Sequence, residues 1–456
     1  MSAKPTIAAI RFGFGLSPSI APPADASAIM AALLGPDPVA ATYPVAPSTE
    51  VWPLAMTEVK LRRDAKLGNP DTMAQFNAAQ RRNRIIAAQG FVNILQRAVQ
   101  SPDGFRERLQ NFWSGHFTVV AKQPVLMCLP TAFAEEALRP HLTGRFADML
   151  KAVVTHPGML AYLDQNSSIG PDSRVGLRRK LGLNENLGRE LLELHTLGVG
   201  AGYTQTDVRQ FAYLLTGLTF NPKQGQFRFN PAAAEPGAEL VLGHRYGGEK
   251  PARLADIFAA LEDIALRPET AHHITTKLAV HFVSDTPDAG LVTAMTAAYT
   301  HSKGFLPAVY EAMLNHPAAW VPAREKVRQP FDFMAASLRA LGVAPEALAG
   351  MPPVFVMRQL LGGLRLMGQP FQHASGPNGW PEAAAAWIEP QTLAARIQWA
   401  MAVPGRIAPD LPDPRDFVTV ALGDTAGAGV RAAARQAETR REGVGLVLAS
   451  ADFNRR

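Results

Sequence analysis

The sequence contains a single cysteine, Cys128, among its 456 residues. One cysteine excludes an intrachain disulfide and a zinc site built from several cysteine ligands. No apolar stretch approaches the roughly 18 residues that a membrane-spanning helix needs. The N-terminal segment "MSAKPTIAAIRFGFGLSP" lacks the long apolar region and the small-residue cleavage site of a secretory signal. We therefore expect a soluble, cytoplasmic protein without a membrane span.

Complete catalytic motifs are also missing. There is no HExxH, GxSxG or Walker sequence, which argues against zincin, α/β-hydrolase and P-loop chemistry. The glycine pair in "RFGFGLS" lacks the third glycine of a dinucleotide fingerprint. The loop "DQNSSIG", which begins at Asp164, opens like a calcium loop, but Val175 occupies the place of the bidentate glutamate. No motif therefore assigns a reaction class.

The charge of the chain gives little reason to expect a nucleic-acid partner. Charged residues make up 18% of the sequence and the net charge is +6, with no long run of like charges. The densest basic stretches, at residues 60–66, 80–84 and 174–180, contain no aromatic residues on which bases could stack. We interpret these stretches as solvated helix faces.

The hydrophobic pattern predicts a mainly α protein with a large, bundle-like body of many helices. Hydrophobic residues make up 47% of the chain and recur at the spacing of amphipathic helices. The expected helices cover residues 73–100, 103–119, 131–138, 145–156, 184–197, 204–216, 251–265, 268–283, 291–299, 305–315 and 324–341. The Pro- and Ala-rich stretch from Ala21 to Pro53 is expected to be a loop on the surface.

One segment departs from the helical pattern. Between Leu218 and Gly248, Phe227 and Phe229 alternate with polar residues, and Asn, Gly and Pro mark turns, which predicts a small β-hairpin excursion. The chain is therefore expected to divide into an N-terminal helical half at 1–217, the excursion at 218–250 and a C-terminal helical half at 251–456. One continuous domain is the alternative.

Two segments of the sequence echo each other. "GRFADMLKAVVTHPGML" starts at Gly144 and "GFLPAVYEAMLNHPAAW" starts at Gly304, and each ends its apolar helix pattern with His-Pro. A remnant of duplication would explain the echo. Independent helix endings explain it as well, because histidine suits the last turn of a helix and proline cannot continue one. We assign neither His156 nor His316 to a site.

The stretch "NENLGRELLELHT", from Asn184 to Thr196, is the strongest candidate for a functional site. On a helix, Glu185, Arg189 and Glu193 share one face with Asn186 and Glu190 beside it. An ion-pair network of a buried helix explains the charges. However, a long loop from Gln165 to Leu183 leads into this helix, and long loops inside compact domains are often functional.

In the functional interpretation, Glu190 is the acid–base group or a metal ligand, Arg189 holds an anionic group, and Glu193 assists. His116, in "FWSGHFTV", is expected to face this helix across a cleft, although a core histidine is the simpler explanation. A divalent metal, if present, would be held by Glu190 and His116. His195 falls among leucines on a regular helix, away from the acidic face.

Five further residues are candidates for ligand binding: Asn184, Asn186, His195, Asp164 and Trp380. Asn184 is also the expected N-cap of the helix, and Trp380 lies in the turn-rich loop "HASGPNGWPEAAAAWI", where it could stack on a sugar or simply anchor the chain. His273, Lys277 and His281 follow one another at four-residue steps. Because a lysine between two histidines repels a metal, we interpret this stripe as a semi-exposed helix face.

Several blocks together resemble a known family. "RFGFGLSP", "FWSGHFTV", "NENLGRELLELHTLGVGAGYTQTDVRQFAYLLTG", "KLAVHFVSD" and "GPNGWPEAAAAWI" are similar to successive blocks of the bacterial family called domain of unknown function 1800. The resemblance spans nearly the whole chain and implies a single helical architecture, but it transfers no activity. It also implies a protein partner from an uncharacterised sulfatase-like family that carries an export signal. Residence in the periplasm by co-export is therefore the alternative to the cytoplasm.

Two functional hypotheses remain open. In the first, the chain is an enzyme or a metal- or ligand-binding protein whose site lies on the Asn184–Thr196 helix with His116. In the second, it is a non-catalytic helical scaffold or an export companion of the sulfatase-like partner. The sequence does not identify a substrate.

Overall fold

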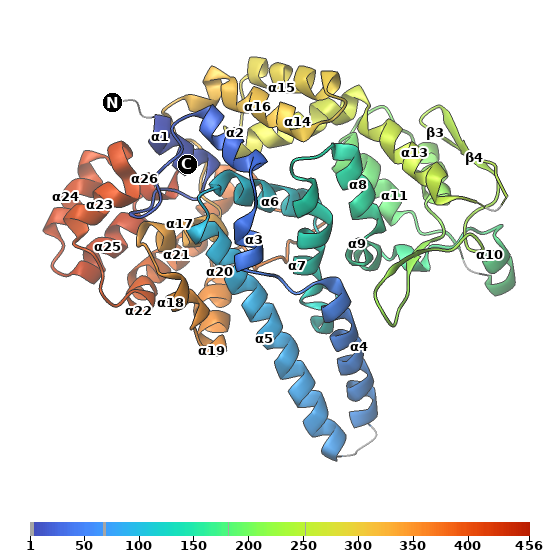
Figure 1. Ribbon diagram of the computed structural model, residues 1–456, viewed down its shortest axis with the longest axis horizontal. Coiled ribbons are helices and arrows are strands. Elements are labelled where there is room, and N and C mark those ends of the chain that lie inside the picture. The colour runs from blue at the N-terminus through green and yellow to red at the C-terminus, as the bar shows by residue number, and fades with distance from the viewer. Residues whose placement is uncertain (1–3, 67–69, 181, 251) are drawn as a thin grey trace.

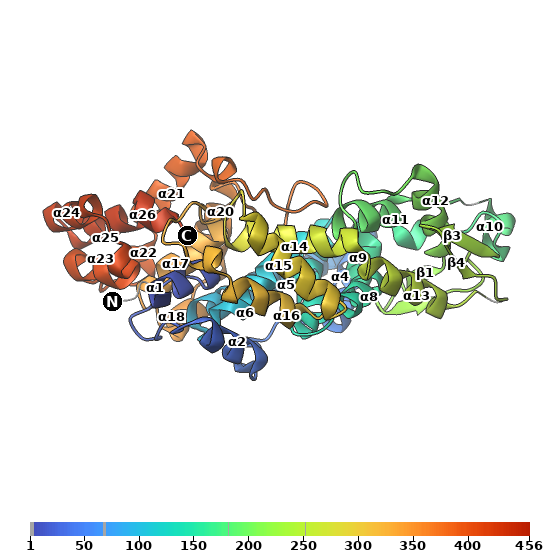
Figure 2. The same cartoon turned by 90° about the horizontal axis from the view of Figure 1, so that it is seen from above.

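The chain forms a mainly α structure, as predicted, with 64% of its residues in helices and 4% in strands. The computed structural model describes residues 4–66, 70–180, 182–250 and 252–456. The body is elongated, with the four short strands at one end and helices α23 to α26 at the other (Figures 1 and 2). A hairpin of two long helices, α4 (Ser48–Ala65) and α5 (Pro70–Gln100), projects from the middle of the body (Figure 1).

The stretch from Ala21 to Pro53 is not the loop that its prolines suggest. It contains α2 (Ala26–Leu34), α3 (Pro38–Thr42) and the start of α4. The carboxylates of Asp25 and Asp37 accept hydrogen bonds from the backbone N–H groups of Ala28 and Ala40, so both short helices have N-caps. Alanine has the highest helix propensity, Pro38 is the first residue of α3, and Pro53 lies inside α4, so the prediction of a loop was wrong here.

The next part of the chain supplies the central helices. These elements are η1 (Ala8–Phe12) after α1 (Lys4–Ile7), then α6 (Gly104–His116), η2 (Pro124–Leu126), α7 (Leu129–Phe133), η3 (Ala134–Leu138), η4 (Arg139–His141), α8 (Phe146–Thr155), α9 (Pro157–Tyr162), η5 (Gln165–Ser167), α10 (Arg174–Arg179), α11 (Asn186–Glu190), η6 (Leu191–Thr196) and α12 (Gln205–Leu214). The predicted helix at 131–138 is thus the end of α7 followed by the π-helical turn η3.

The hairpin excursion is confirmed and contains two hairpins. β1 (Leu218–Phe220) pairs antiparallel with β2 (Phe227–Phe229), and β3 (Ala238–Val241) pairs antiparallel with β4 (His244–Gly247). Before them, α12 begins with a capping box, in which Thr204 and Asp207 exchange side-chain and backbone hydrogen bonds.

The C-terminal part returns to helices. Its elements are α13 (Leu254–Ala265), α14 (Pro268–Phe282), α15 (Ala289–His301), α16 (Leu306–Asn315), η7 (Pro317–Trp320), α17 (Pro330–Ala340), α18 (Pro345–Ala349), α19 (Pro353–Phe355), η8 (Val356–Leu361), α20 (Gly362–Leu366), η9 (Ala384–Trp387), α21 (Pro390–Ala402), α22 (Pro404–Ile407), α23 (Pro414–Leu422), η10 (Gly423–Thr425), α24 (Ala428–Gln436), α25 (Arg440–Ala449) and α26 (Ala451–Asn454).

The predicted helix at 324–341 starts late. α17 begins only at Pro330, and Gln329 before it has an extended backbone, since the residue ahead of a proline is pushed out of the helical region. Val327 instead forms an antiparallel bridge with Arg455 near the end of the chain.

Two hydrophobic cores lie side by side along the body. The first gathers buried side chains of α6, α8, α13, α14 and α16, including Trp113, Phe146 and Tyr310. The second gathers side chains of α5, α17, α20, α21, α23 and α25, including Phe91 and Phe333. The second core combines residue 14 and residues 88–99 with residues 331–453, so neither core coincides with the expected halves, and the division into domains at 217 and 251 stays a prediction.

Within the part of the chain that the structure describes, no helix is both long enough and apolar enough to cross a membrane.

Candidate functional site

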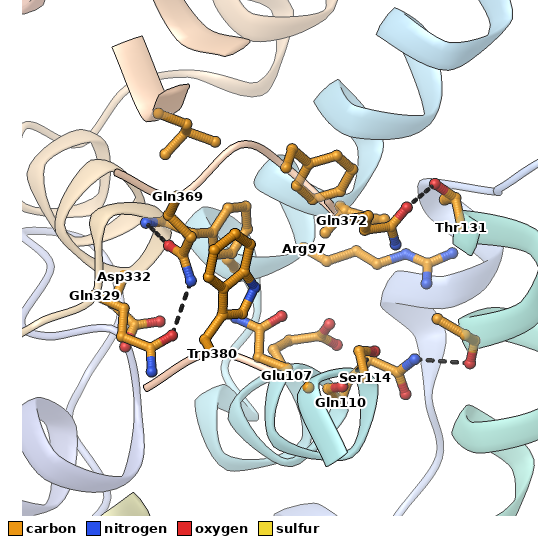
Figure 3. Close-up of a pocket in the computed structure, with 18 of the residues that line it drawn as sticks. Arg97, Glu107, Gln110, Ser114, Thr131, Gln329, Asp332, Gln369, Gln372 and Trp380 are labelled. Carbon is orange, nitrogen blue, oxygen red and sulfur yellow. Dashed lines mark hydrogen bonds between the residues drawn. The ribbon is translucent and has the colours of Figure 1, made fainter. Parts of the chain in front are cut away.

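A cavity of ≈ 90 Å³ lies where the two cores meet, beside α6 (Figure 3). Its wall comes from α5, α6, the α7–η3 turn, the start of α17 and the loop at residues 367–383. We call it the Trp380 cavity, because the predicted ligand-binding residue Trp380 lines it. Its other polar lining residues are Arg97, Glu107, Gln110, Asn111, Ser114, Thr131, Glu135, Arg139, Gln329, Asp332, Gln369 and Gln372.

The charged side chains in this wall are paired with one another or with a neighbour behind the wall. Arg97 lies 2.6 Å from the Glu135 carboxylate, and Arg139 lies 2.6 Å from the Glu107 carboxylate. Although burial opposes it, the hydrogen bonds to Glu107 and to Asp37 raise the pKa of Arg139. Asp332 pairs with Arg108. The cavity therefore presents little free charge to a ligand.

The uncharged amides of the wall are only partly satisfied. Gln369 accepts from the backbone N–H of Phe331 and donates to Gln329, both at 2.8 Å, and Gln372 accepts from the Thr131 hydroxyl (Figure 3). Gln110 donates to the Ala134 carbonyl at 2.7 Å.

Three further groups in the wall have hydrogen-bonding capacity to spare. The buried Oε1 of Gln110 has no hydrogen-bond partner among the described residues. The Asn111 amide and the Trp380 indole N–H likewise make no hydrogen bond within the described ranges. These atoms are the ones that a ligand in the cavity could satisfy.

A tight backbone contact fixes the loop that carries Trp380. Gly379 has a φ of +79°, and a Cβ atom there would lie 2.2 Å from the carbonyl oxygen of Gly115 on α6. Only glycine fits such an approach. The Trp380 ring also packs against the Trp387 ring, with 6.2 Å between the ring centroids.

His116, the predicted partner of the acidic helix, is buried elsewhere on α6. Its ring lies against Trp113 and Phe117, and its Nε2 lies 3.1 Å from the backbone carbonyl of His195. Burial, followed by the nearby Lys277, His195 and His273, holds the pKa of His116 well below its usual value. The structure thus places His116 among aromatic rings, as the simpler explanation expects.

His195 belongs to the same buried group of histidines. The centroids of the His116 and His195 rings are 5.7 Å apart, and those of His116 and His273 are 6.4 Å apart. His195 is fully buried, and neither ring nitrogen has a hydrogen-bond partner among the described residues. Burial and then Lys277 lower the pKa of His195 to about 3. The imidazole therefore stays neutral at ordinary pH.

A π-helical turn explains part of this arrangement. In η6 the backbone N–H of Leu197 donates to the carbonyl of Leu192 at 3.0 Å, five residues back, and the Thr196 hydroxyl donates to the Leu191 carbonyl. A regular α-helix over 184–197 is therefore wrong in its second half, and the angular positions expected for His195 and Thr196 shift. The first half behaves as predicted, with Arg189 pairing with Glu185 at 3.0 Å.

The stripe of His273, Lys277 and His281 is semi-exposed at His273 and Lys277, as the spacing suggests, but buried at His281. His281 is buried and lies 2.6 Å from the Glu382 carboxylate and 3.0 Å from Arg108. His273 bonds to the Leu194 carbonyl at 3.1 Å, and burial lowers the pKa of Lys277 to about 8. The stripe faces η6 and the loop that carries Trp380.

Glu190 and Glu193 lie half-buried on α11 and η6. Burial, then the neighbouring Glu193, raises the pKa of Glu190, while Arg189 opposes this rise. Neither carboxylate forms an ion pair with a described residue. Both lie near Tyr203, whose pKa is raised by burial and then by Glu193. No contact joins Glu190 to His116 in the described ranges.

Asn184, Asn186 and Asp164 lie at the N-terminal end of α11. Asn184 donates to the carbonyls of Leu163 and Asp164 and accepts from the backbone N–H of Asn186 at 3.0 Å. It thus caps the helix from one residue before the observed N-cap, Glu185. Asp164 is exposed and pairs with Lys122 at 2.6 Å.

The predicted residues therefore fall into four places: Trp380 in the cavity, His116 with His195 in the buried histidine group, Glu190, Glu193 and Arg189 on α11 and η6, and Asn184, Asn186 and Asp164 at the start of α11. No group of three or more His, Cys, Asp or Glu side chains in the described part of the chain is arranged to hold a metal ion. The glutamine and asparagine residues of the cavity were not predicted, because "RLQNFW" and "GQPFQ" carry no motif that distinguishes them from surface amides.

Comparison with known proteins identifies the family and nothing more specific. No curated protein and no solved structure matches the chain. The model of one family matches residues 7–455, which is nearly the whole chain. The chain therefore belongs to the family described as protein of unknown function (DUF1800).

Proposed function

We propose that this protein binds a small, uncharged, hydroxyl-bearing molecule, such as a sugar or a polyol, in the Trp380 cavity. The main support for the proposal is that the charged side chains of the wall already have partners, whereas several uncharged groups still have free hydrogen-bonding atoms. Arg97, Arg139 and Asp332 are paired, whereas Gln110, Asn111 and Trp380 keep free hydrogen-bonding atoms. A charged ligand would have to break an existing ion pair, while a hydroxyl needs only the free amides.

Trp380 adds a stacking surface to these amides. An indole offers both an apolar face and one N–H donor, and hydroxylated rings present both C–H faces and hydroxyl groups. The cavity is small, so it suits a single ring or a short polyol. Ser114 and Thr131 supply further hydroxyls at its edge.

Isothermal titration calorimetry with matched neutral and anionic probes tests the proposal. We expect glucose, sorbitol or glycerol to bind saturably and glucuronate or glucose 6-phosphate to bind at least about tenfold more weakly, which corresponds to about 1.4 kcal/mol. Trp380→Ala should weaken binding by about tenfold or more. Asn378→Ala, an exposed position on the same loop, is the control and should leave binding unchanged. The proposal fails if no neutral probe binds or if Trp380→Ala binds as the parent does.

A second candidate function is acid–base catalysis at Glu190, with Arg189 holding an anionic group. It is supported by the raised pKa of Glu190, which burial and the neighbouring Glu193 cause, since a raised pKa brings a carboxyl group closer to the range in which a general acid works. Glu190→Gln should then abolish an activity without a large loss of stability. A stability change of several kcal/mol with no change in any activity would favour a structural role.

The remaining alternative is a non-catalytic scaffold for a sulfatase-like partner. It predicts that the Trp380 and Glu190 variants bind such a partner as the parent does, and that no small molecule alters the complex.

A further inference from the structure

Four buried arginines surround one carboxylate beside the Trp380 cavity. Arg108, Arg328, Arg396 and Arg456 each expose 1% of their surface or less, and Asp332, at 3%, is the carboxylate near them. Arg108 pairs with Asp332, and Arg456 Nε lies 3.8 Å from the same carboxylate.

The local backbone explains why these side chains gather. The bridge between Val327 and Arg455 aligns residues 326–328 with residues 454–456. Arg328 N–H donates to the Asn454 carbonyl at 2.8 Å, and Arg456 N–H donates to the Lys326 carbonyl at 2.9 Å. Because side chains alternate along an extended segment, Lys326, Arg328 and Arg456 point to the same side. That side faces Asp332 at the start of α17.

Most of the hydrogen-bonding capacity of these arginines is unused. Among the described residues, the guanidinium nitrogens without a hydrogen-bond partner are Arg108 Nε, Arg328 Nη2, Arg396 Nε and Nη2, and all three of Arg456. Arg339, another buried arginine, differs clearly, since it donates to the carbonyls of Gly15, Val99 and Ser101. A buried guanidinium group is less costly when its N–H groups donate hydrogen bonds, so these donors favour an acceptor placed between them.

The charge of the surrounding network also favours an anionic ligand. The network continues from Arg108 through His281 to Glu382 and Lys326. Its cations are Arg108, Lys326, Arg328, Arg396 and Arg456, and its carboxylates are Asp285, Asp332 and Glu382. Cations thus outnumber the side-chain carboxylates of this network, which favours an anionic ligand.

We infer that the cluster of Arg108, Arg328, Arg396 and Arg456 is a binding site for one small tetrahedral oxyanion of the sulfate or phosphate type. Guanidinium groups present planar pairs of N–H donors that match oxyanions. Arg328 and Arg396 also stack on Phe453 and Phe333, which orients them without using their N–H groups. Burial, the largest cause, lowers the pKa of Arg328 to about 9 and that of Arg396 to about 10, and a bound anion would offset this cost.

The site lies between the two cores, because Asp332 belongs to α17 and Arg108 to α6. The bound oxyanion is thus expected to hold the cores together. This inference does not depend on the proposed ligand of the Trp380 cavity, although Asp332 borders both.

Thermal unfolding of the full chain, first dialysed into chloride buffer, tests the site. We expect sodium sulfate or sodium phosphate at millimolar concentration to raise Tm saturably relative to sodium chloride at equal ionic strength. At a concentration 100 times Kd, the ratio of folded to unfolded chain should rise about 100-fold. An equal rise with chloride, or no saturable rise, overturns the inference.

Arg396→Met separates binding from a merely structural role. In chloride it should be as stable as the parent or more stable, because an unpaired buried charge is removed, and in sulfate it should be less stable than the parent. Arg406→Met is the control, since Arg406 also stacks on an aromatic ring, Phe355, but is exposed and lies outside the cluster. The same loss of stability in both buffers overturns the inference.

Equilibrium dialysis of the unmodified protein with labelled sulfate and labelled phosphate covers the case in which Arg396→Met does not fold. One equivalent bound per chain supports the site and shows which oxyanion it prefers. No binding of either anion overturns the inference.

Discussion

Arg145 and Phe305, far apart in the sequence, lie opposite each other in an antiparallel backbone bridge. Phe146 N–H donates to the Gly304 carbonyl at 2.8 Å, and Leu306 N–H donates to the Gly144 carbonyl at 3.0 Å. The two echoing segments therefore meet at their equivalent glycines, and each then enters a helix of the same length, α8 or α16. The reciprocal pairing favours a duplicated unit over two independent helix endings.

The two His-Pro endings also share their geometry, but His156 has a stronger hydrogen-bond partner than His316 among the described residues. His156 and His316 have ψ angles of 133° and accept hydrogen bonds through Nδ1 from the backbone N–H two residues ahead, at 2.9 Å and 3.3 Å. His156 also contacts Glu136 through Nε2 at 2.8 Å. We predict that His156→Ala lowers the free energy of unfolding by about 1–3 kcal/mol and His316→Ala by less than about 1 kcal/mol. Urea denaturation of both variants measures the difference, and equal losses would contradict the prediction.

The buried imidazole of His195 predicts a loss of stability in mild acid. Its pKa is lowered from 6.5 to about 3, so between these values the unfolded chain binds a proton at His195 that the folded chain does not. The free energy of unfolding therefore falls as pH falls below about 6.5, by up to about 1.4 kcal/mol per pH unit for this group.

His195→Leu isolates that contribution. Its plot of unfolding free energy against pH, measured in urea between about pH 4.5 and 7.5, should be less steep than that of the parent, whatever the two values are at neutral pH. Parallel plots would mean that His195 gains its proton in the folded state. Groups that His195 does not affect, such as Glu239, contribute equally to both plots.

We expect the loss of the Arg139 side chain to lower the stability of the protein strongly. It is 7% exposed, and it pairs with Glu107 at 2.6 Å and with Asp37 at 2.7 Å. Arg139→Met leaves the buried Glu107 without this cation and should cost about 3–5 kcal/mol. Arg63→Met, which removes an exposed ion pair with Asp64, is the control and should change stability by less than about 0.5 kcal/mol. Similar values for the two variants, measured by chemical denaturation, would refute the prediction.

Gly379→Ala should displace the loop that carries Trp380. The new Cβ would overlap the Gly115 carbonyl, and the positive φ adds about 1–3 kcal/mol of backbone strain. We expect a change in tryptophan emission and a loss of sugar binding by about tenfold or more. Gly202→Ala is the control, because nothing lies within 4 Å of its Cβ position and its φ is not positive. Unchanged emission in Gly379→Ala would show that the loop does not depend on this contact.

Local sequence signals predicted much of the fold. The helix that begins after Thr204, with its capping box, and the hairpin excursion after Leu218 both follow from interactions within a few residues. The secondary-structure predictions were wrong where contacts between distant parts of the sequence determine the local backbone conformation. The backbone of residues 326–328 is extended because it pairs with residues 454–456, which no local pattern reveals.

The candidate sites were predicted only in part for the same reason. Trp380 was named from its turn-rich loop, but its neighbours Gln110 and Gln372 come from distant elements and look like ordinary polar residues in sequence. His116 and His195 were named separately, and the π-helical turn that helps to bring their rings to 5.7 Å is invisible to a regular helical wheel. Whether Glu190, Glu193 and Arg189 act together in catalysis stays a prediction.

The contact between Gly379 and Gly115 links two parts of the molecule that differ in chemistry. Gly115 borders the Trp380 cavity, and the very next residue carries the buried imidazole of His116. Any occupant that pushes the tryptophan loop outward therefore relaxes a peptide unit attached directly to that histidine. The ring resonances of His116 and His195 in a nuclear magnetic resonance spectrum should accordingly shift when the cavity fills, although no ligand touches either ring.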